Sequence, residues 1–146
     1  MAPTDIGQKL DEALTKIVRA DASIQQLCER TERLVIPWGD FGTAKLPVVL
    51  YQRVDLSERG GLGDTREAIY DFTAVAEGEG GRALANALIE RVELAITQPA
   101  MAAQGLDASP VGAWRRRPLG VRDQVGGANT QERVAEQLEA RFLVTK

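Results

Sequence analysis

The stretch "REAIYDFTAVAEGEGGRALANALIERVELAITQP", residues 66–99, contains the two periodicities that decide the fold. In its first part, Tyr70 and Phe72 alternate with Asp71 and Thr73. Strict alternation of apolar and polar side chains is typical of a strand with one buried face. We therefore expect a strand over residues 66–78, with its aromatic side chains in the core.

The second part of the stretch changes to the helical period. Its apolar side chains recur every three or four positions, at Leu84, Leu88, Val92 and Ile96. Gly81 precedes this run and Pro99 is expected to close it. A helix of about 16 residues is roughly 24 Å long, enough to cover a small sheet. We expect its apolar side to pack against Tyr70, Phe72 and Phe142 and form the core.

The patterns on either side of this stretch predict the remaining elements. We expect, in chain order, helices at 5–19 and 22–29, strands at 33–39, 46–56 and 66–78, the long helix, a strand at 109–120 and a final segment at 132–146. The final segment is ambiguous between helix and strand, and we interpret its last part as a strand. The result is an α+β fold: a single sheet of about four to five mainly antiparallel strands backed by the long helix and the N-terminal helices. Residues 1–146 are expected to form one domain.

Two segments are polar and rich in glycine, at 57–65 and 123–131. Because they carry little apolar material to bury, we expect mobile loops that become ordered against a partner. The candidate partner-contact residues in and beside these loops are Glu58, Arg59, Asp64, Arg66, Asp123 and Gln124.

The composition argues against catalysis. Histidine is absent, which removes the usual general base near neutral pH and most zinc and haem ligation. Cys28 is the single cysteine, and its place on an apolar helix face favours a buried hydrophobe over a reactive thiol. The glycine runs at 59–63 and 78–81 lack the lysine and spacing of a phosphate loop. We expect no catalytic residue, no cofactor, no metal and no enzymatic activity.

No run of about 18 apolar residues is present, so we expect no membrane partner. The first residues are amphipathic and acidic, without the apolar core of a signal peptide. We expect a protein that is made in the cytosol and remains or assembles there.

The run "WRRRP", residues 114–118, raises the question of nucleic-acid binding. The net charge of −3 is uneven, because residues 1–108 carry −6 and residues 109–146 carry +3. In a strand, however, Arg115 and Arg117 point to one face while Trp114 and Arg116 point to the other. Single-strand binding uses aromatic side chains beside a basic groove, and none accompanies Arg115 and Arg117. We therefore interpret the run as an assembly feature.

Alternation places the run beside other charges. If Phe72 and Phe142 face the helix, the opposite face of the sheet holds Asp71, Arg115, Arg117, Glu139 and Arg141. Charges of mixed sign on one face can pair within a subunit or with the next copy. We expect these residues to form a subunit or tail interface, with Trp114 on the helix side closing the end of the core.

The order of elements has a specific parallel. One or two helices and a short strand with a proline precede a "P-x-x-x-Y" strand, "LPVVLYQRV" at 46–54. A glycine-rich loop, the strand "AIYDFTAVAE", the long helix, and an arginine before an aromatic finish, "EARFLVTK", follow. Over residues 6–145 this layout resembles the tail-completion and tail-terminator (head–tail joining) proteins of bacteriophages.

The resemblance implies a structural virion protein that caps the tail tube and joins it to the neck as a ring, with six copies expected. It implies the tail tube protein and a neck or connector protein as partners, and a place in the tail or neck after assembly in the host cytoplasm. DNA would at most pass through the ring lumen.

A neighbouring head–tail connector or stopper protein would have a similar layout. A soluble α+β ligand-binding module or enzyme is a further alternative. A solution mass near six times 15.8 kDa would distinguish the ring from this last class.

Overall fold

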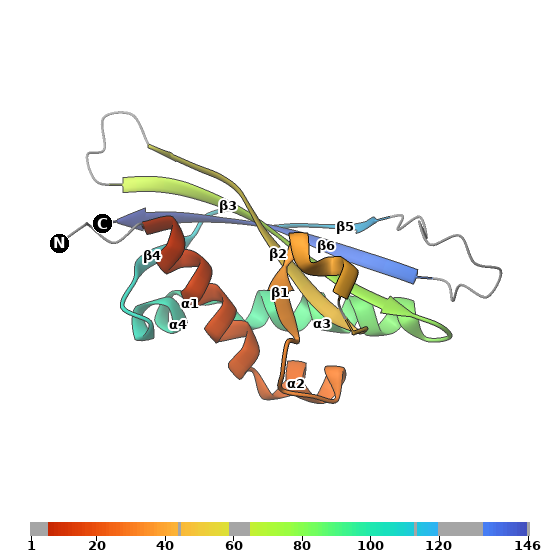
Figure 1. Cartoon of the computed structure of the whole chain (residues 1–146). Coiled ribbons are helices and arrows are strands. Elements are labelled where there is room, and N and C mark those ends of the chain that lie inside the picture. Colours follow the sequence, from red (N-terminus) through yellow and green to blue (C-terminus); the bar gives the residue numbers. More distant parts are fainter. Residues whose placement is uncertain (1–5, 44, 59–64, 113, 120–132, 146) are drawn as a thin grey trace.

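The structure, a computed structural model, describes residues 6–43, 45–58, 65–112, 114–119 and 133–145. One sheet carries the α-helices on one of its faces (Figure 1). The elements are α1 (Ile6–Ala20), α2 (Ala22–Cys28), β1 (Val35–Pro37), the 3-10 helix η1 (Trp38–Thr43), β2 (Val48–Glu58), β3 (Thr65–Glu77), α3 (Gly81–Ala95), α4 (Gln98–Ala103), β4 (Asp107–Pro110), β5 (Arg115–Leu119) and β6 (Arg133–Thr145). The predicted α+β class is confirmed.

The sheet has the strand order β1-β2-β3-β6-β4, and β5 pairs with the same edge of β6 as β4. Only β1, which runs parallel to β2, departs from antiparallel pairing among the described strands. The sheet has six strands where four to five were expected. The difference arises because the predicted strand at 109–120 is interrupted. Gly112 there adopts a left-handed φ of 67°, and the chain forms two short strands, β4 and β5.

The prediction that Pro99 closes the long helix is wrong. Helix α3 ends at Ala95, and Pro99 lies in the first turn of a separate helix, α4. Proline is tolerated in a first helical turn because a backbone N–H at that position has no acceptor within the helix, so its absence costs no hydrogen bond. Thr97 caps α4 by accepting a hydrogen bond from the Ala100 N–H at 3.2 Å. The ambiguous final segment is a strand over its described length, because β6 pairs with β3 from Arg133 to Thr145.

The core lies between the sheet and the helices, as predicted. Leu88 and Val92 of α3 are fully buried and belong to one cluster with Tyr70, Phe72 and Phe142. The rings of Tyr70 and Phe72 are stacked with centroids 6.0 Å apart, and Phe142 meets Tyr70 edge-on at 6.3 Å. The buried Tyr70 hydroxyl donates a hydrogen bond to Asp11 of α1. Burial and this bond raise the pKa of Tyr70, so the phenol stays protonated.

A second apolar cluster lies on the other face of the sheet, which we call the outer face because it is opposite α3. Its buried members are Ile36, Val48, Leu50, Val75 and Ala135. Phe41 of η1 packs on this cluster, and the Arg133 guanidinium lies 5.6 Å from the centre of the Phe41 ring. One end of the outer face is therefore apolar and covered, which the sequence interpretation did not foresee.

Candidate functional site: the charged cluster of the outer face

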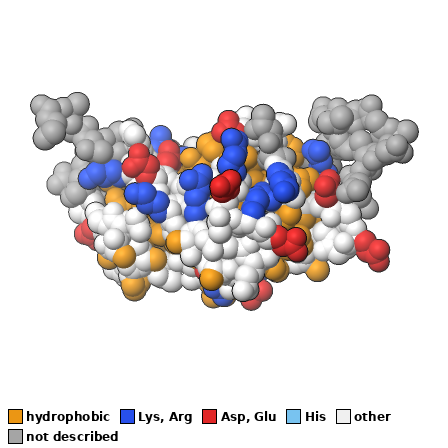
Figure 2. Space-filling model, turned by 60° about the horizontal axis from the view of Figure 1, so that its bottom comes forward, with side chains coloured by type: hydrophobic (Ala, Val, Ile, Leu, Met, Phe, Trp, Pro, Cys, Tyr) orange, Lys and Arg blue, Asp and Glu red, His pale blue; other side chains and the backbone are white. Residues whose placement is uncertain are grey.

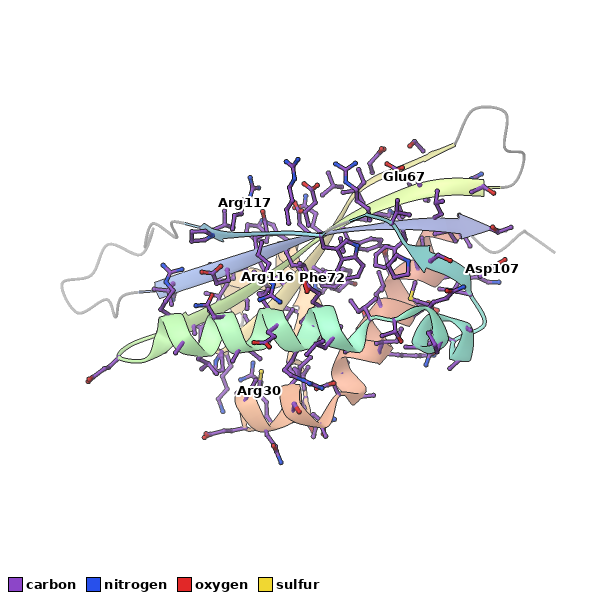
Figure 3. All side chains as sticks on the ribbon, turned by 180° about the vertical axis from the view of Figure 1, so that it is seen from behind. Arg30, Glu67, Phe72, Asp107, Arg116 and Arg117 are labelled. Carbon is purple, nitrogen blue, oxygen red and sulfur yellow. The ribbon has the colours of Figure 1, made fainter. Side chains whose placement is uncertain are left out.

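Strand register brings the predicted interface residues together on the outer face. Asp71 of β3 and Arg115 of β5 are both register partners of Glu139 in β6. Arg117 points away from α3, whereas Arg116 and Phe72 point toward it (Figure 3). The predicted alternation is therefore confirmed. We call Asp71, Arg115, Arg117, Glu139 and Arg141 the charged cluster.

A hydrogen-bond chain across three strands holds Arg117 in place. Its Nε and Nη2 donate to the Gln137 side-chain oxygen at 2.8 and 2.6 Å. The Gln137 amide nitrogen then donates to the Thr73 hydroxyl at 3.2 Å, and both of these side chains are buried. Satisfied polar chains of this kind rigidify their surroundings. The guanidinium is thus presented from a fixed base on the sheet.

The carboxylates of the cluster lie close enough to influence one another. Burial raises the pKa of Asp71 above its ordinary value, Glu139 raises that pKa further, and Arg117 opposes the rise. Arg141 donates to Glu139 at 3.1 Å and lies 3.8 Å from Glu67. The outer face therefore carries arginines and acids as one connected arrangement of mixed sign. Such a surface can recognise a partner of complementary charge and shape.

The predicted loop contacts are only partly located by the structure. Glu58 and Arg66 were expected in or beside the glycine-rich loop, but they are register partners at the ends of β2 and β3. The antiparallel ladder continues past Leu56, so the hairpin is longer than the apolar pattern indicated. Arg59, Asp64, Asp123 and Gln124 lie outside the described residues. Most residues of the two loops that were expected to be mobile, 57–65 and 123–131, also lie outside the described residues. The exceptions are Ser57, Glu58 and Thr65, which belong to strands β2 and β3.

The helix side of the arginine run has different contacts. Nε and Nη2 of Arg116 donate to the two Glu93 carboxylate oxygens of α3, at 3.3 and 3.2 Å. The bond to Glu93 raises the pKa of Arg116, and the nearby Glu90 and Glu136 contribute. The sequence alone did not indicate that Arg116 and Glu93 are partners, because the strand that carries Arg116 is distant in sequence from α3.

Trp114 closes one end of the core, as expected, but it is only partly buried. Its ring meets Phe142 edge-on at 5.2 Å, and its Nε1 donates to the Arg141 carbonyl at 3.2 Å. An open groove of about 390 Å³ lies beside it, lined by Glu93, Ile96, Pro110, Gly112 and Trp114. The sequence did not indicate this groove.

The described part of the chain holds no group of three or more His, Cys, Asp or Glu side chains placed to bind a metal ion. None of the described helices is long and apolar enough to cross a membrane. Cys28 is buried, and burial raises the pKa of its thiol.

Comparison with known proteins identifies a structural similarity. No protein-family model matches the chain, and no curated protein matches it significantly. The chain is similar to a chain in a solved structure described as "Virion of native gene transfer agent (GTA) particle". The TM-score is 0.67 at 16% sequence identity, over 99% of this chain and 100% of that chain. The two chains share a fold along their entire lengths.

Proposed function

We propose that the protein is a structural component of a phage-like virion. The observation that carries this proposal is the similarity to a chain of a gene transfer agent virion, which covers 99% of this chain and 100% of the other. A whole domain, with its helices and sheet, is shared. The charged cluster supports the same conclusion, because rigid recognition surfaces suit a part whose work is assembly.

Within the virion, we propose that the protein caps the tail tube and joins it to the head or neck as a ring of six copies. The order of elements that resembles tail-completion proteins supports this role. The partners would be the tail tube protein and a neck or connector protein, and DNA would at most pass through the lumen. A neighbouring connector or stopper role draws equal support from the structural similarity, because the description names the whole particle.

We assign the charged cluster to docking against a neighbour in the particle. Exposed ion pairs contribute only about 0–1 kcal/mol each, so mixed charges give register and specificity more than bulk affinity. Arg115 and Arg117 are exposed on the outer face. Reversing their charge should leave the fold intact and impair docking.

The test is deletion of the gene in a strain that produces the particle. We expect electron micrographs to show heads and tails that are not joined, and wild-type protein supplied in trans to restore complete particles. The variant Arg115→Glu with Arg117→Glu should fold and fail to restore them, whereas Arg115→Lys with Arg117→Lys keeps the charges as a matched control. Complete particles in the deletion strain would overturn the proposal. DNA binding at about 0.15 M salt that the double arginine reversal abolishes, with assembly intact, would replace it by nucleic-acid recognition.

A further inference from the structure

Two arginines of the outer face differ from other arginines in their pairing. Carboxylates neutralise several guanidinium groups among the described residues, those of Arg53, Arg82, Arg91, Arg116 and Arg141. Figure 2, which brings forward the side that carries the helices, shows Lys and Arg side chains beside Asp and Glu side chains. Arg115 and Arg117, in contrast, form no ion pair with any residue that the structure describes.

The acids beside these two arginines do not neutralise them. Glu139 is the register partner of Arg115, but its carboxylate accepts a hydrogen bond from Arg141 at 3.1 Å. Burial and Glu139 raise the pKa of Asp71, although Arg117 opposes the rise. A tight ion pair with Arg117 would lower that pKa instead. The charges of Arg115 and Arg117 are therefore available to a partner.

A neutral side chain, and not a carboxylate, holds Arg117 in place. The Gln137 side-chain oxygen accepts both the Nε and the Nη2 hydrogen bonds, at 2.8 and 2.6 Å. An amide oxygen orients the guanidinium without cancelling its charge. Arg117 is exposed, and its Nη1 makes no hydrogen bond within the part of the chain that the structure describes. This nitrogen is free to donate to an acceptor on another molecule.

The support of Arg117 is itself fixed, because Gln137 donates to the Thr73 hydroxyl at 3.2 Å and both side chains are buried. A long arginine side chain loses rotamer freedom when it binds a partner, and this loss opposes association. For Arg117, part of the freedom is already lost in the folded chain. Arg115 has no side-chain hydrogen bond to the described residues that would restrict it in this way.

The surroundings of the two arginines favour a protein partner over nucleic acid. Duplex DNA presents one negative charge for about every 1.7 Å of its axis. The outer face places the carboxylates of Glu67, Asp71 and Glu139 among its arginines, and they would repel a continuous row of phosphates. A carboxylate at one position of a protein surface can face an arginine and avoid these acids.

We infer that Arg115 and Arg117 bind acidic side chains of the virion protein on which the outer face docks, and that Gln137 positions Arg117 for this contact. The inference rests on the docking role proposed above, because it names the chemistry of the neighbour. Thr73 acts through Gln137 and touches no partner. The neutrality of Gln137 is the decisive property, since a carboxylate in its place would keep the hydrogen bonds of Arg117 and cancel its charge.

The first test compares variants supplied in trans to the deletion strain. In Gln137→Glu, the new carboxylate accepts the same bonds from Arg117, and the Thr73 hydroxyl can rotate to donate to it. This variant should fold, as checked by circular dichroism and denaturant midpoint, and give about tenfold fewer complete particles, because like charges across an interface repel. Gln26→Glu, at an exposed position of α2, is the matched control and should give the wild-type yield.

A second variant covers the case in which Gln137→Glu does not fold. Gln137→Met combined with Thr73→Val removes both polar partners together, so no buried group of this pair loses only its own partner. Arg117 then keeps its charge and loses its support. We expect a folded chain and about threefold fewer complete particles, because Arg117 must be ordered at docking.

The acidic partner is identified by reversing charges on both sides of the contact. In a strain that carries Arg117→Glu, the Asp and Glu residues of the tail tube and neck proteins are changed to lysine one at a time. At least one lysine should restore complete particles with Arg117→Glu and reduce their number with the wild-type chain. Such reciprocal behaviour is the sign of a direct pair.

The outcomes separate this inference from the proposed function. Wild-type yield from a folded Gln137→Glu, or from the Met and Val double variant where Gln137→Glu does not fold, would overturn the positioning role and leave docking by the arginines standing. If no lysine restores particles, the acidic partner is overturned. Arginine reversals that join heads to tails but transfer no DNA would assign the arginines to nucleic acid and overturn it as well. Complete particles in the deletion strain would overturn the proposed function and this inference together.

Discussion

The two faces of β3 and β6 place neighbouring residues in opposite environments. Toward α3, Tyr70, Phe72 and Phe142 are fully buried in one aromatic group. Asp71 and Arg141, which directly precede Phe72 and Phe142 in the sequence, face the other way and remain partly or fully exposed. The same backbone ladder supports both sets, so the difference arises from the two-residue period of the strand. One face holds the main core, and the other carries the charged cluster.

This comparison separates two kinds of effect. Substitutions toward α3 should change the free energy of unfolding, because they remove buried contacts and leave cavities. Substitutions in the charged cluster should change docking with little effect on stability, because exposed pairs contribute little. The covered end of the outer face, around Val48 and Leu50, is an exception, since these side chains are as buried as the main core.

The largest expected effect comes from the buried side of α3. Leu88 is fully buried, so Leu88→Ala should lower the free energy of unfolding by about 2–5 kcal/mol. Leu94 on the same helix is 54% exposed, and Leu94→Ala should cost less than about 0.5 kcal/mol. Denaturant midpoints at equal slope measure both changes. Equal losses for the two leucines would mean that the covered face has been assigned wrongly.

An intermediate effect is expected at the boundary between the faces. Sequence reasoning alone would put Trp114→Ala at about 3–5 kcal/mol, on the assumption of a fully buried ring. The ring is half-buried beside an open groove, so we expect about 1–2 kcal/mol from the lost contact with Phe142. Trp114→Phe keeps an aromatic ring at the contact and removes the Nε1 donor to the Arg141 carbonyl together with part of the ring, so it should cost less than the alanine variant. A phenylalanine variant as unstable as the alanine variant would show that an aromatic ring beside Phe142 is not what Trp114 contributes.

The alternation that separates the faces could be predicted from the sequence, because it depends only on the local period. Tyr70 with Phe72, Asp71 with Glu139, and the division of the arginine run all followed from it. The boundaries of elements could not be predicted in the same way. Pro99 is compatible with both the end of one helix and the start of another, and packing of the following residues decides between them.

Features that depend on pairing between distant segments were also missed. The second apolar cluster requires Val75 and Ala135 to lie side by side, which only the register of β3 and β6 establishes. The bond between Arg116 and Glu93 joins residues 23 positions apart and depends on where β5 crosses α3. The local sequence pattern does not indicate which residues that are distant in the sequence become neighbours in the fold.

The smallest expected effect tests whether the charged cluster changes the free energy of unfolding. Burial raises the pKa of Asp71, and repulsion by Glu139 raises it further. A carboxyl whose pKa is higher in the folded chain than its ordinary 3.8 binds its proton more tightly when folded, so ionised Asp71 destabilises the fold at neutral pH.

Asp71→Asn should therefore raise the free energy of unfolding at pH 7, by less than about 1 kcal/mol for a partly exposed group. The gain should shrink as the pH falls through the folded-state pKa of Asp71 and vanish well below 3.8, where the aspartate is protonated in both states. Asp55→Asn, at an exposed position of β2, is the matched control for the change from a carboxylate to an amide. A loss of stability in Asp71→Asn at pH 7 would mean that attraction to Arg117 outweighs burial, and that this cluster stabilises the fold as well as serving recognition.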